Sequence, residues 1–185
     1  MKSNLFIISG PSGSGQDSII QGLAKHLAVE RVITTTTRKI RPGESQKNPY
    51  YFISKKRFKQ GIKKGEFLEY ALEYNNNYYG VTKREIKRIR SLKKIGIWKI
   101  EYKGVQTAKK IFPSIIAILI TAPLKDLKKR IKERDNATPQ YLKERMEYTK
   151  KFLKNKHLYD YEVINHQNKL DQSIKKVLDI INKHK

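Results

Sequence analysis

The chain has 185 residues, which suits one compact domain with a central sheet covered by helices. It has no cysteine, which excludes disulfides and thiolate metal sites. It also has no apolar run long enough to cross a bilayer, which excludes a transmembrane anchor. Because Met1 to Ser9 lacks a secretory pattern, we expect a cytoplasmic protein. The formal net charge of +24 allows attraction to polyanions, among them RNA and nucleotides.

The first predicted elements are a strand and a helix joined by a glycine-rich loop. Leu5 to Ile8 is a short, branched apolar run that glycine ends, and this predicts a buried strand. Behind the loop, apolar residues recur at helical spacing at Ile19, Ile20, Leu23 and Leu27. Glycines let backbone N–H groups approach a phosphate, and the helix directs its partial positive end to the same point. The sequence therefore predicts a phosphate-binding loop.

This loop departs from the usual motif at its end. The motif G-x-x-x-x-G-K-[ST] supplies backbone donors, a lysine for the β- and γ-phosphates and a hydroxyl for Mg²⁺. Gly10 and Gly15 have the required spacing, but Gln16 replaces the lysine and Asp17 the hydroxyl residue, while Ser18 offers a hydroxyl one position later. We therefore expect a loop that keeps its backbone donors and loses its mobile cation. A glycine turn that binds nothing is the alternative.

A small mixed insertion follows over residues 34–82. Four threonines from Thr34 favour extended chain over helix because they are β-branched. Further on we expect a turn at Pro42-Gly43, a short helix capped by Ser54 and ended by Gly65, and a hairpin of residues 66–73 and 77–80 around an asparagine-rich turn.

The remainder of the chain alternates between helices and strands. The predicted elements are a helix over 83–94, a strand over 95–101, a helix over 104–112, a strand over 115–120, a helix over 124–134, a helix from Pro139 to about His157 with Thr138 as its cap, a strand over 161–164 and a helix over 170–183. Such alternation is typical of an α/β fold with a three-layer parallel sheet.

Motifs along nearly the whole chain resemble the guanylate kinase family. They are Gly10-Pro-Ser-Gly-x-Gly, Thr36-Thr-Arg38-x-x-Arg41-x-Gly-Glu44, Tyr50-x-Phe52, Glu66-Phe-x-Glu69, Tyr78-Tyr-Gly80, Gly104-Val, Arg130-x-x-x-Arg134, Arg145 and Asp160-Tyr-x-Val-Ile-Asn165. The resemblance implies a phosphate-loop nucleoside monophosphate kinase, which transfers the terminal phosphate of ATP to GMP or dGMP with Mg²⁺. It also implies one domain with a core (1–33, 83–124 and 149–185), a GMP-binding insertion (34–82) and a helical lid (125–148).

The resemblance assigns the acceptor site to residues of the insertion. Arg38 and Arg41 match the residues that grip the GMP phosphate, a task for which the guanidinium fork is well suited. Tyr50 and Tyr79 match hydroxyl donors to the same phosphate, with ordinary aromatic packing as the alternative.

The guanine base is assigned to three further positions. Glu69 matches the carboxylate that accepts from guanine N1–H and its amino group, and Thr34 keeps a hydroxyl that touches the base. Val81 departs from the family, which usually has Ser or Thr there. Glu101 matches an acid near the acceptor.

The donor site and lid are assigned to the loop and to three arginines. Arg130, Arg134 and Arg145 match the lid arginines that close over the phosphates and exclude water. The implied ATP-binding residues are Gly10, Pro11, Ser12, Gly13, Ser14, Gly15, Gln16, Asp17, Ser18, Arg130, Arg134 and Asn165.

A further departure lies in the strand over 95–101. The family's acidic pair Asp/Glu-x-Asp is Lys99-Ile-Glu101 here. Glu101 keeps an acid that, with Ser18, could hold Mg²⁺ through water. Our hypothesis is that the missing cation has moved to Lys99; the alternative is a lysine on the solvent side of a strand end.

Three functions follow from these patterns. The first is a guanylate kinase weakened by Gln16, which acts as a monomer or weak homodimer. The second is a catalytically inactive relative that binds nucleotide or phosphopeptide, since loss of the loop lysine with retained arginines also fits such modules. The third, RNA binding, rests on charge alone, and lysines interleaved with Ile and Leu favour a solvated surface instead. We commit to the enzyme and do not expect a nucleic-acid partner.

Overall fold

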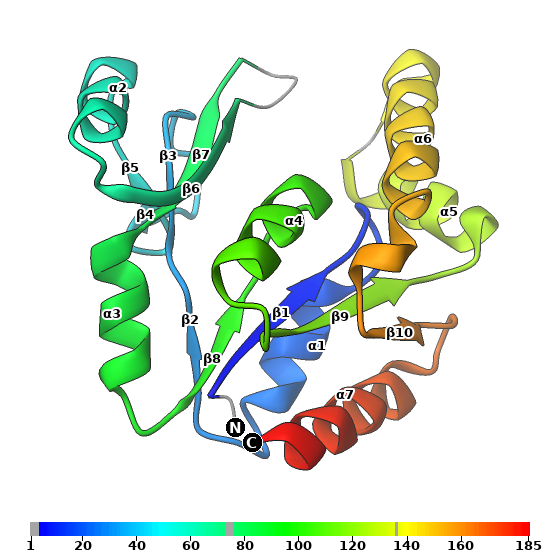
Figure 1. Ribbon diagram of the computed structural model, residues 1–185. Coiled ribbons are helices and arrows are strands. Elements are labelled where there is room, and N and C mark those ends of the chain that lie inside the picture. The colour runs from blue at the N-terminus through cyan, green and yellow to red at the C-terminus, as the bar shows by residue number, and fades with distance from the viewer. Residues whose placement is uncertain (1–3, 73–75, 136) are drawn as a thin grey trace.

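The computed structural model describes residues 4–72, 76–135 and 137–185 (Figure 1). Over these residues the chain forms two five-stranded sheets and seven α-helices. The first sheet lies at the base of Figure 1, and the second sheet and helix α6 (Pro139–Leu153) rise above it on opposite sides.

The first sheet is wholly parallel. Its order is β10 (Tyr161–Ile164), β9 (Ile116–Thr121), β1 (Leu5–Ser9), β8 (Ile95–Trp98) and β2 (Val29–Arg31). All five residues of the central strand β1 are buried, as expected of a strand covered on both faces.

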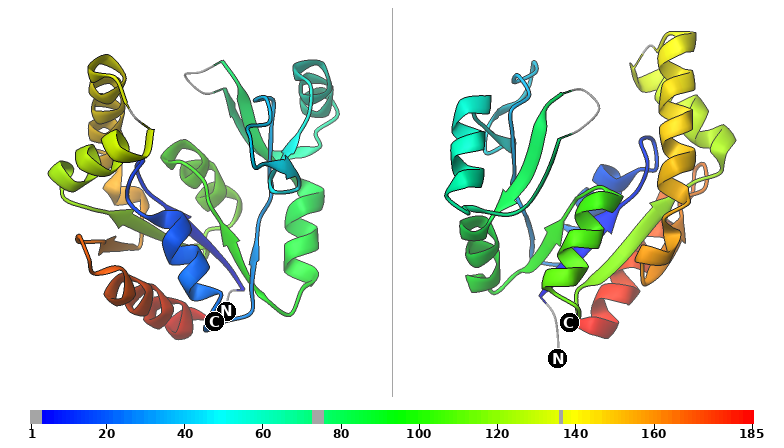
Figure 2. Two further views of the ribbon diagram at one scale, coloured as in Figure 1. Left: turned by 180° about the vertical axis from the view of Figure 1, so that it is seen from behind. Right: turned by 45° about the horizontal axis from the view of Figure 1, so that its top comes forward.

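Alternate residues of β1 enter two different hydrophobic clusters. Phe6 and Ile8 pack with apolar residues of α1 (Gln16–Leu23) and α7 (Leu170–His184). Leu5 and Ile7 pack with Trp98 and with residues of α3 (Lys83–Ser91) and α4 (Tyr102–Ile111). Figure 2 shows α1 and α7 on one face of the sheet and α4 on the other. The predicted three-layer α/β core is confirmed.

Helices α1 and α7 approach each other closely because α1 carries a glycine at their contact. A Cβ on Gly22 would overlap the side chain of Ile174. Since interiors are packed to crystal-like density, the two helices are fixed against each other beneath the glycine loop.

The second sheet is mixed, and α2 (Lys55–Lys63) packs beside it (Figure 1). Its order is β4 (Ser45–Gln46), β5 (Pro49–Phe52), β3 (Thr34–Thr36), β7 (Tyr78–Thr82) and β6 (Phe67–Leu72). The extended threonines and the β6–β7 hairpin are confirmed, whereas residues 73–75 of its turn lie outside the described residues. The Ser54 cap is also confirmed, since its hydroxyl accepts from Arg57 N at 3.1 Å.

The core differs from the prediction in one strand that was missed and in the ends of two elements. β2 was not predicted, because Val29–Arg31 carries two charges in three residues and gives no apolar signal. Helix α3 ends at Ser91, before the expected residue 94. The strand predicted over 95–101 ends at Trp98, and beyond it Ile100 O accepts from the side-chain hydroxyl of Ser9 in β1.

The C-terminal elements follow the predicted order. Helix α5 (Leu124–Asp135) precedes α6, whose cap Thr138 accepts from Tyr141 N at 3.3 Å. Helix α6 ends at Leu153, and a short 3₁₀ helix, η1 (Lys156–Leu158), takes the place of its predicted last turn. None of the described helices combines the length and apolarity required to span a bilayer.

A buried carboxylate links the two sheets where the chain passes from β2 to β3. Glu85 is 3% exposed, and its Oε1 accepts from Ile33 N at 2.9 Å. Arg88 donates to both oxygens of Glu85, at 2.8 and 3.0 Å, and also to Glu30 Oε1 at 2.8 Å. This ion pair therefore fixes the connection between the parallel core and the mixed sheet.

Glu85→Ala should lower the free energy of unfolding by about 2–4 kcal/mol, because Ile33 N–H loses its acceptor and Arg88 its best-buried partner. The measurement is urea unfolding followed by the fluorescence of Trp98, the single tryptophan of the chain. Glu66→Ala is the control, since its pair with Arg57 is exposed and is worth less than about 1 kcal/mol. Equal losses in the two variants would contradict the assignment.

Candidate active site

A cleft of about 820 Å³ lies above the carboxyl ends of the core strands. It is lined by the glycine loop, by residues of the mixed sheet and by residues of α5 and α6. Every site residue predicted from the sequence lines this cleft except Asn165. Among the residues that the structure describes, seven cationic and four acidic ones line it, so the cleft is suited to anions.

The glycine loop at one end of the cleft is held from outside by the core. Gly13 and Gly15 have positive φ angles, 82° and 92°, which glycine adopts without strain. A Cβ on Gly10 would overlap the carbonyl oxygen of Ile120 in β9, so only glycine fits there. The loop therefore needs its glycines for close approach as well as for its turns.

Asn165 lies beneath this loop. It is 5% exposed; its Nδ2 donates to Ser14 O at 2.9 Å, and its Oδ1 accepts from Ser173 Oγ at 3.1 Å. A Cβ on Gly15 would overlap the same amide. Asn165 therefore supports the loop from below.

Gln16 lies across the loop whose lysine it replaces. Its Nε2 donates to Gly10 O and lies 3.4 Å from Ser14 Oγ. The amide group thus occupies the inside of the loop as a neutral donor.

Asp17 lies in the first turn of α1 and is paired with two cations. Its Oδ2 accepts from Lys99 Nζ at 2.6 Å, and its Oδ1 accepts from Arg31 Nη2 at 2.8 Å. Burial alone would raise the pKa of the Asp17 carboxyl, but Lys99 and Arg31 outweigh it, so this pKa lies below its ordinary value. Lys99 follows the end of β8, and Arg31 ends β2, the next strand of the sheet.

The opposite end of the cleft holds Arg38 in a fixed position. Its Nη2 donates to Glu44 Oε1 at 2.7 Å, and its guanidinium lies 5.5 Å from the ring centroids of both Tyr50 and Phe52. The hydrogen bond with Glu44 raises the pKa of Arg38. Glu44 also accepts from Arg41 N at 2.8 Å, which closes the loop that carries both arginines.

Aromatic and hydroxyl groups surround this pair. The Tyr50 and Tyr79 rings lie 6.0 Å apart in an edge-to-face arrangement, and burial raises the pKa of Tyr50. Thr34 lines the cleft from β3. Val81 does not line it, because its side chain is fully buried with Leu5 and Ile7 in the core.

Two further carboxylates line the cleft. Glu69 on β6 is 8% exposed, and a Cβ on Gly104 would lie 3.3 Å from its Oε2, so the absence of a side chain at Gly104 lets this carboxylate approach α4. Glu101 directly precedes α4, and its carboxylate accepts from the hydroxyl of Tyr148 on α6.

Arginines of α5 and α6 reach the glycine loop from the other side. Arg130 donates to Gly13 O at 3.2 Å, and Arg134 donates to Ser12 Oγ at 2.9 Å. Arg145 lies 5.9 Å from the centroid of the Tyr148 ring. Two cations of α5 thus reach the loop, and Arg145 of α6 lines the same cleft.

Three residues of this site were missed from the sequence: Arg31, Glu44 as the partner of Arg38, and Tyr148. Glu44 belongs to a motif that was recognised, and its spacing of six residues from Arg38 could have indicated the pair. Arg31 could have been found only after β2 was recognised, because carboxyl ends of parallel strands meet at one edge. No local signal pairs Tyr148 with Glu101 across 47 positions.

A glycine loop between a central parallel strand and a helix, facing an arginine-rich cleft, defines a phosphate-loop α/β protein. A model of the guanylate kinase family matches residues 2–184. The guanylate kinase of Buchnera aphidicola subsp. Acyrthosiphon pisum (strain APS) is 40% identical over 181 residues, or 96% of this chain and 86% of that protein. This chain therefore belongs to the guanylate kinase family.

A second relative and a solved structure are also similar to this chain. The guanylate kinase of Hydrogenovibrio crunogenus (strain DSM 25203 / XCL-2) is 34% identical over 182 residues, or 97% of this chain and 87% of that protein. The crystal structure of guanylate kinase from Anaplasma phagocytophilum superposes with a TM-score of 0.76 at 19% identity, covering 98% of this chain and 86% of that chain. At that identity the likeness shows the shared fold.

The pKa of the Asp17 carboxyl should lie below 3.8 in the native protein and should rise in Lys99→Met, where burial opposes ionisation with only Arg31 left to offset it. Because the folded-state pKa is lowered, the pairs stabilise the fold above the unfolded-state pKa, and this stability is lost as the pH falls through the folded-state value. Carbon-detected NMR titration measures the shift. An unchanged pKa in Lys99→Met would contradict the ion pair.

Proposed function

We propose that this protein transfers the terminal phosphate of ATP to GMP or dGMP, which gives ADP and the corresponding diphosphate. The observation that carries the proposal is that one cleft holds a phosphate loop at one end and a paired-arginine site with a buried glutamate at the other. Phosphoryl transfer requires mainly that two anions be positioned and their charge offset.

The donor ATP belongs at the glycine loop. Backbone N–H groups of the loop residues other than Pro11, together with the start of α1, favour phosphate there. Arg130 and Arg134, which already contact the loop, offset the charge of the transferred group. We propose that residues 125–148 form a lid, and that its closure brings Arg145 to the phosphates and excludes water.

The acceptor belongs at the mixed sheet, in residues 34–82. Arg38 and Arg41 bind its phosphate, because a guanidinium fork matches phosphate oxygens in a bidentate manner. Tyr50 and Tyr79 add hydroxyl donors. Glu69 accepts from guanine N1–H and the amino group, which adenine cannot reproduce because it has no N1–H, and Thr34 contacts the base.

The residues of the cleft fit Mg²⁺ in the way that this ion is usually held. Mg²⁺ binds through one or two carboxylates together with substrate phosphates. Among the described residues no cluster of three His, Cys, Asp or Glu could hold a metal alone, but Ser18 and Glu101 both line the cleft. We assign the ion to these two residues, through water; when bound it neutralises charge that develops on the β- and γ-oxygens.

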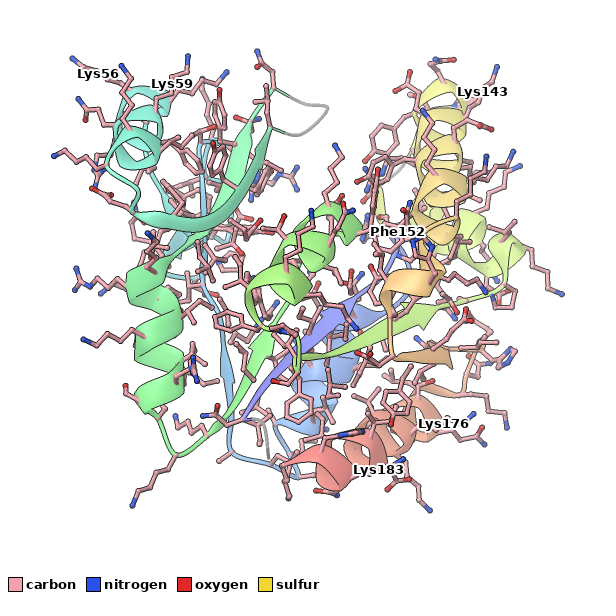
Figure 3. The ribbon with its side chains drawn as sticks, in the orientation of Figure 1. Lys56, Lys59, Lys143, Phe152, Lys176 and Lys183 are labelled. Carbon is pink, nitrogen blue, oxygen red and sulfur yellow. The ribbon has the colours of Figure 1, made fainter. Side chains whose placement is uncertain are left out.

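We further propose that the protein acts in the cytoplasm as a monomer or weak homodimer, with nucleotides and not nucleic acid as its partners. In support, the labelled lysines of Figure 3 are exposed and lie on three separate helices, α2, α6 and α7. Scattered charges of this kind are typical of a solvated surface.

One observation favours a second candidate, a nucleotide- or phosphopeptide-binding relative without catalysis. Gln16 places a neutral amide where the motif has a lysine, and loss of one preorganised donor costs about 3–4 kcal/mol at a transition state. Against it, Arg130 and Arg134 reach the loop, and binding of a peptide would make no use of them.

A coupled assay for ADP formation tests the proposal. With ATP and Mg²⁺, we expect turnover with GMP or dGMP and far less with AMP, CMP or UMP. Glu69→Gln should lower kcat/KM for GMP by about ten- to a hundred-fold, because an amide cannot accept both guanine hydrogens as well as a carboxylate does.

The matched control is Glu66→Gln, since Glu66 lies in an exposed ion pair and does not line the cleft. It should leave kcat/KM unchanged. Binding of GMP without turnover with any acceptor would favour the second candidate and reject the kinase.

A further inference from the structure

The phosphate loop lacks a cation of its own. In this class of loop a lysine that follows the last glycine reaches the β- and γ-phosphates. Gln16 takes that position, and its Nε2 is directed back to Gly10 O. A neutral amide supplies a hydrogen bond but no charge, so any compensating cation comes from outside the loop.

Lys99 emerges beside this loop. Strand β8 pairs with β1, with Trp98 opposite Ile7, so the residue after Trp98 leaves the sheet at the edge where the loop begins. Lys99 Nζ lies 2.6 Å from Asp17 Oδ2, and its side chain is 33% exposed. An ammonium group therefore already lies over the first turn of α1, one residue from Gln16.

Asp17 is paired with two cations, although one is sufficient to neutralise its charge. Its other oxygen accepts from Arg31 at 2.8 Å, so the carboxylate stays neutralised if Lys99 leaves it. Arg31 ends β2, which is separated from β1 by β8 and is therefore farther from the loop across the sheet. Of the two cations, Lys99 is the one whose strand adjoins the loop.

The geometry points to Lys99 as the cation of the phosphate loop, held by Asp17 until the β- and γ-phosphates of ATP replace that carboxylate as its partner. Arg31 then keeps Asp17 neutral and prevents it from repelling the phosphates. This inference rests on the proposed function, because it assigns a role in binding the donor ATP.

Isothermal titration calorimetry with Mg-ATP tests it. Lys99→Met keeps the length of the side chain and removes its charge; the affinity for Mg-ATP should fall by about ten- to a hundred-fold, as for a lost hydrogen bond between charged groups. The affinity for GMP, measured in the same variant, should stay at its native value. Lys110→Met, on the exposed last turn of α4, is the matched control and should bind both as the native chain does.

A double variant separates phosphate binding from simple neutralisation of Asp17. If Lys99 only neutralises Asp17, then Asp17→Asn in the Lys99→Met background restores Mg-ATP binding, and the inference is overturned. If Lys99 binds the phosphates, the double variant stays weak, whereas Gln16→Lys in the Lys99→Met background recovers affinity because it returns a cation to the loop.

Two more results would overturn the inference: native Mg-ATP affinity in Lys99→Met, or a larger loss in Arg31→Gln than in Lys99→Met. Turnover in the native chain is measured separately. If the native chain turns over and Lys99→Met keeps its affinity for Mg-ATP, only the role of Lys99 is refuted. If the native chain does not turn over but Lys99→Met loses affinity for Mg-ATP, only the kinase activity is refuted.

Discussion

The parallel pairing of β1, β8 and β2 is the constraint on which the site depends. Because parallel strands end at the same edge of a sheet, three short segments that are distant in sequence reach one place. They deliver the glycine loop, Lys99 and Arg31 to the first turn of α1. Burial of β1 on both faces keeps this edge in register, since a shift by one residue would exchange the contents of the two hydrophobic clusters.

The cleft keeps its cations in place with internal carboxylates. Arg38 is paired with Glu44, Lys99 and Arg31 with Asp17, and Arg134 with Asp135. Such pairs keep the cations at the cleft before any anion arrives, so that binding does not have to draw them in from solvent. They also limit the repulsion among seven cationic side chains around one space.

The sequence predicted most of the fold because its strongest signals are local. The run before Gly10, the run over 115–120 and the caps Ser54 and Thr138 each act within a few residues. It could not predict β2, because this charged segment forms a strand only through backbone pairing with β8 beside it. The contact of Asn165 with Ser14 and that of Tyr148 with Glu101 were hidden for the same reason: they join segments more than forty positions apart.

The close contact of Gly22 with Ile174 determines which part of the cleft is rigid. Helix α1 cannot tilt without α7, and Asn165 and Ile120 hold the loop at its other sides. The glycine loop is therefore held rigidly by the core. Any movement that narrows the cleft must therefore come from the segments around the loop. The connection between the two sheets is one such segment, and Glu85 holds its backbone at Ile33.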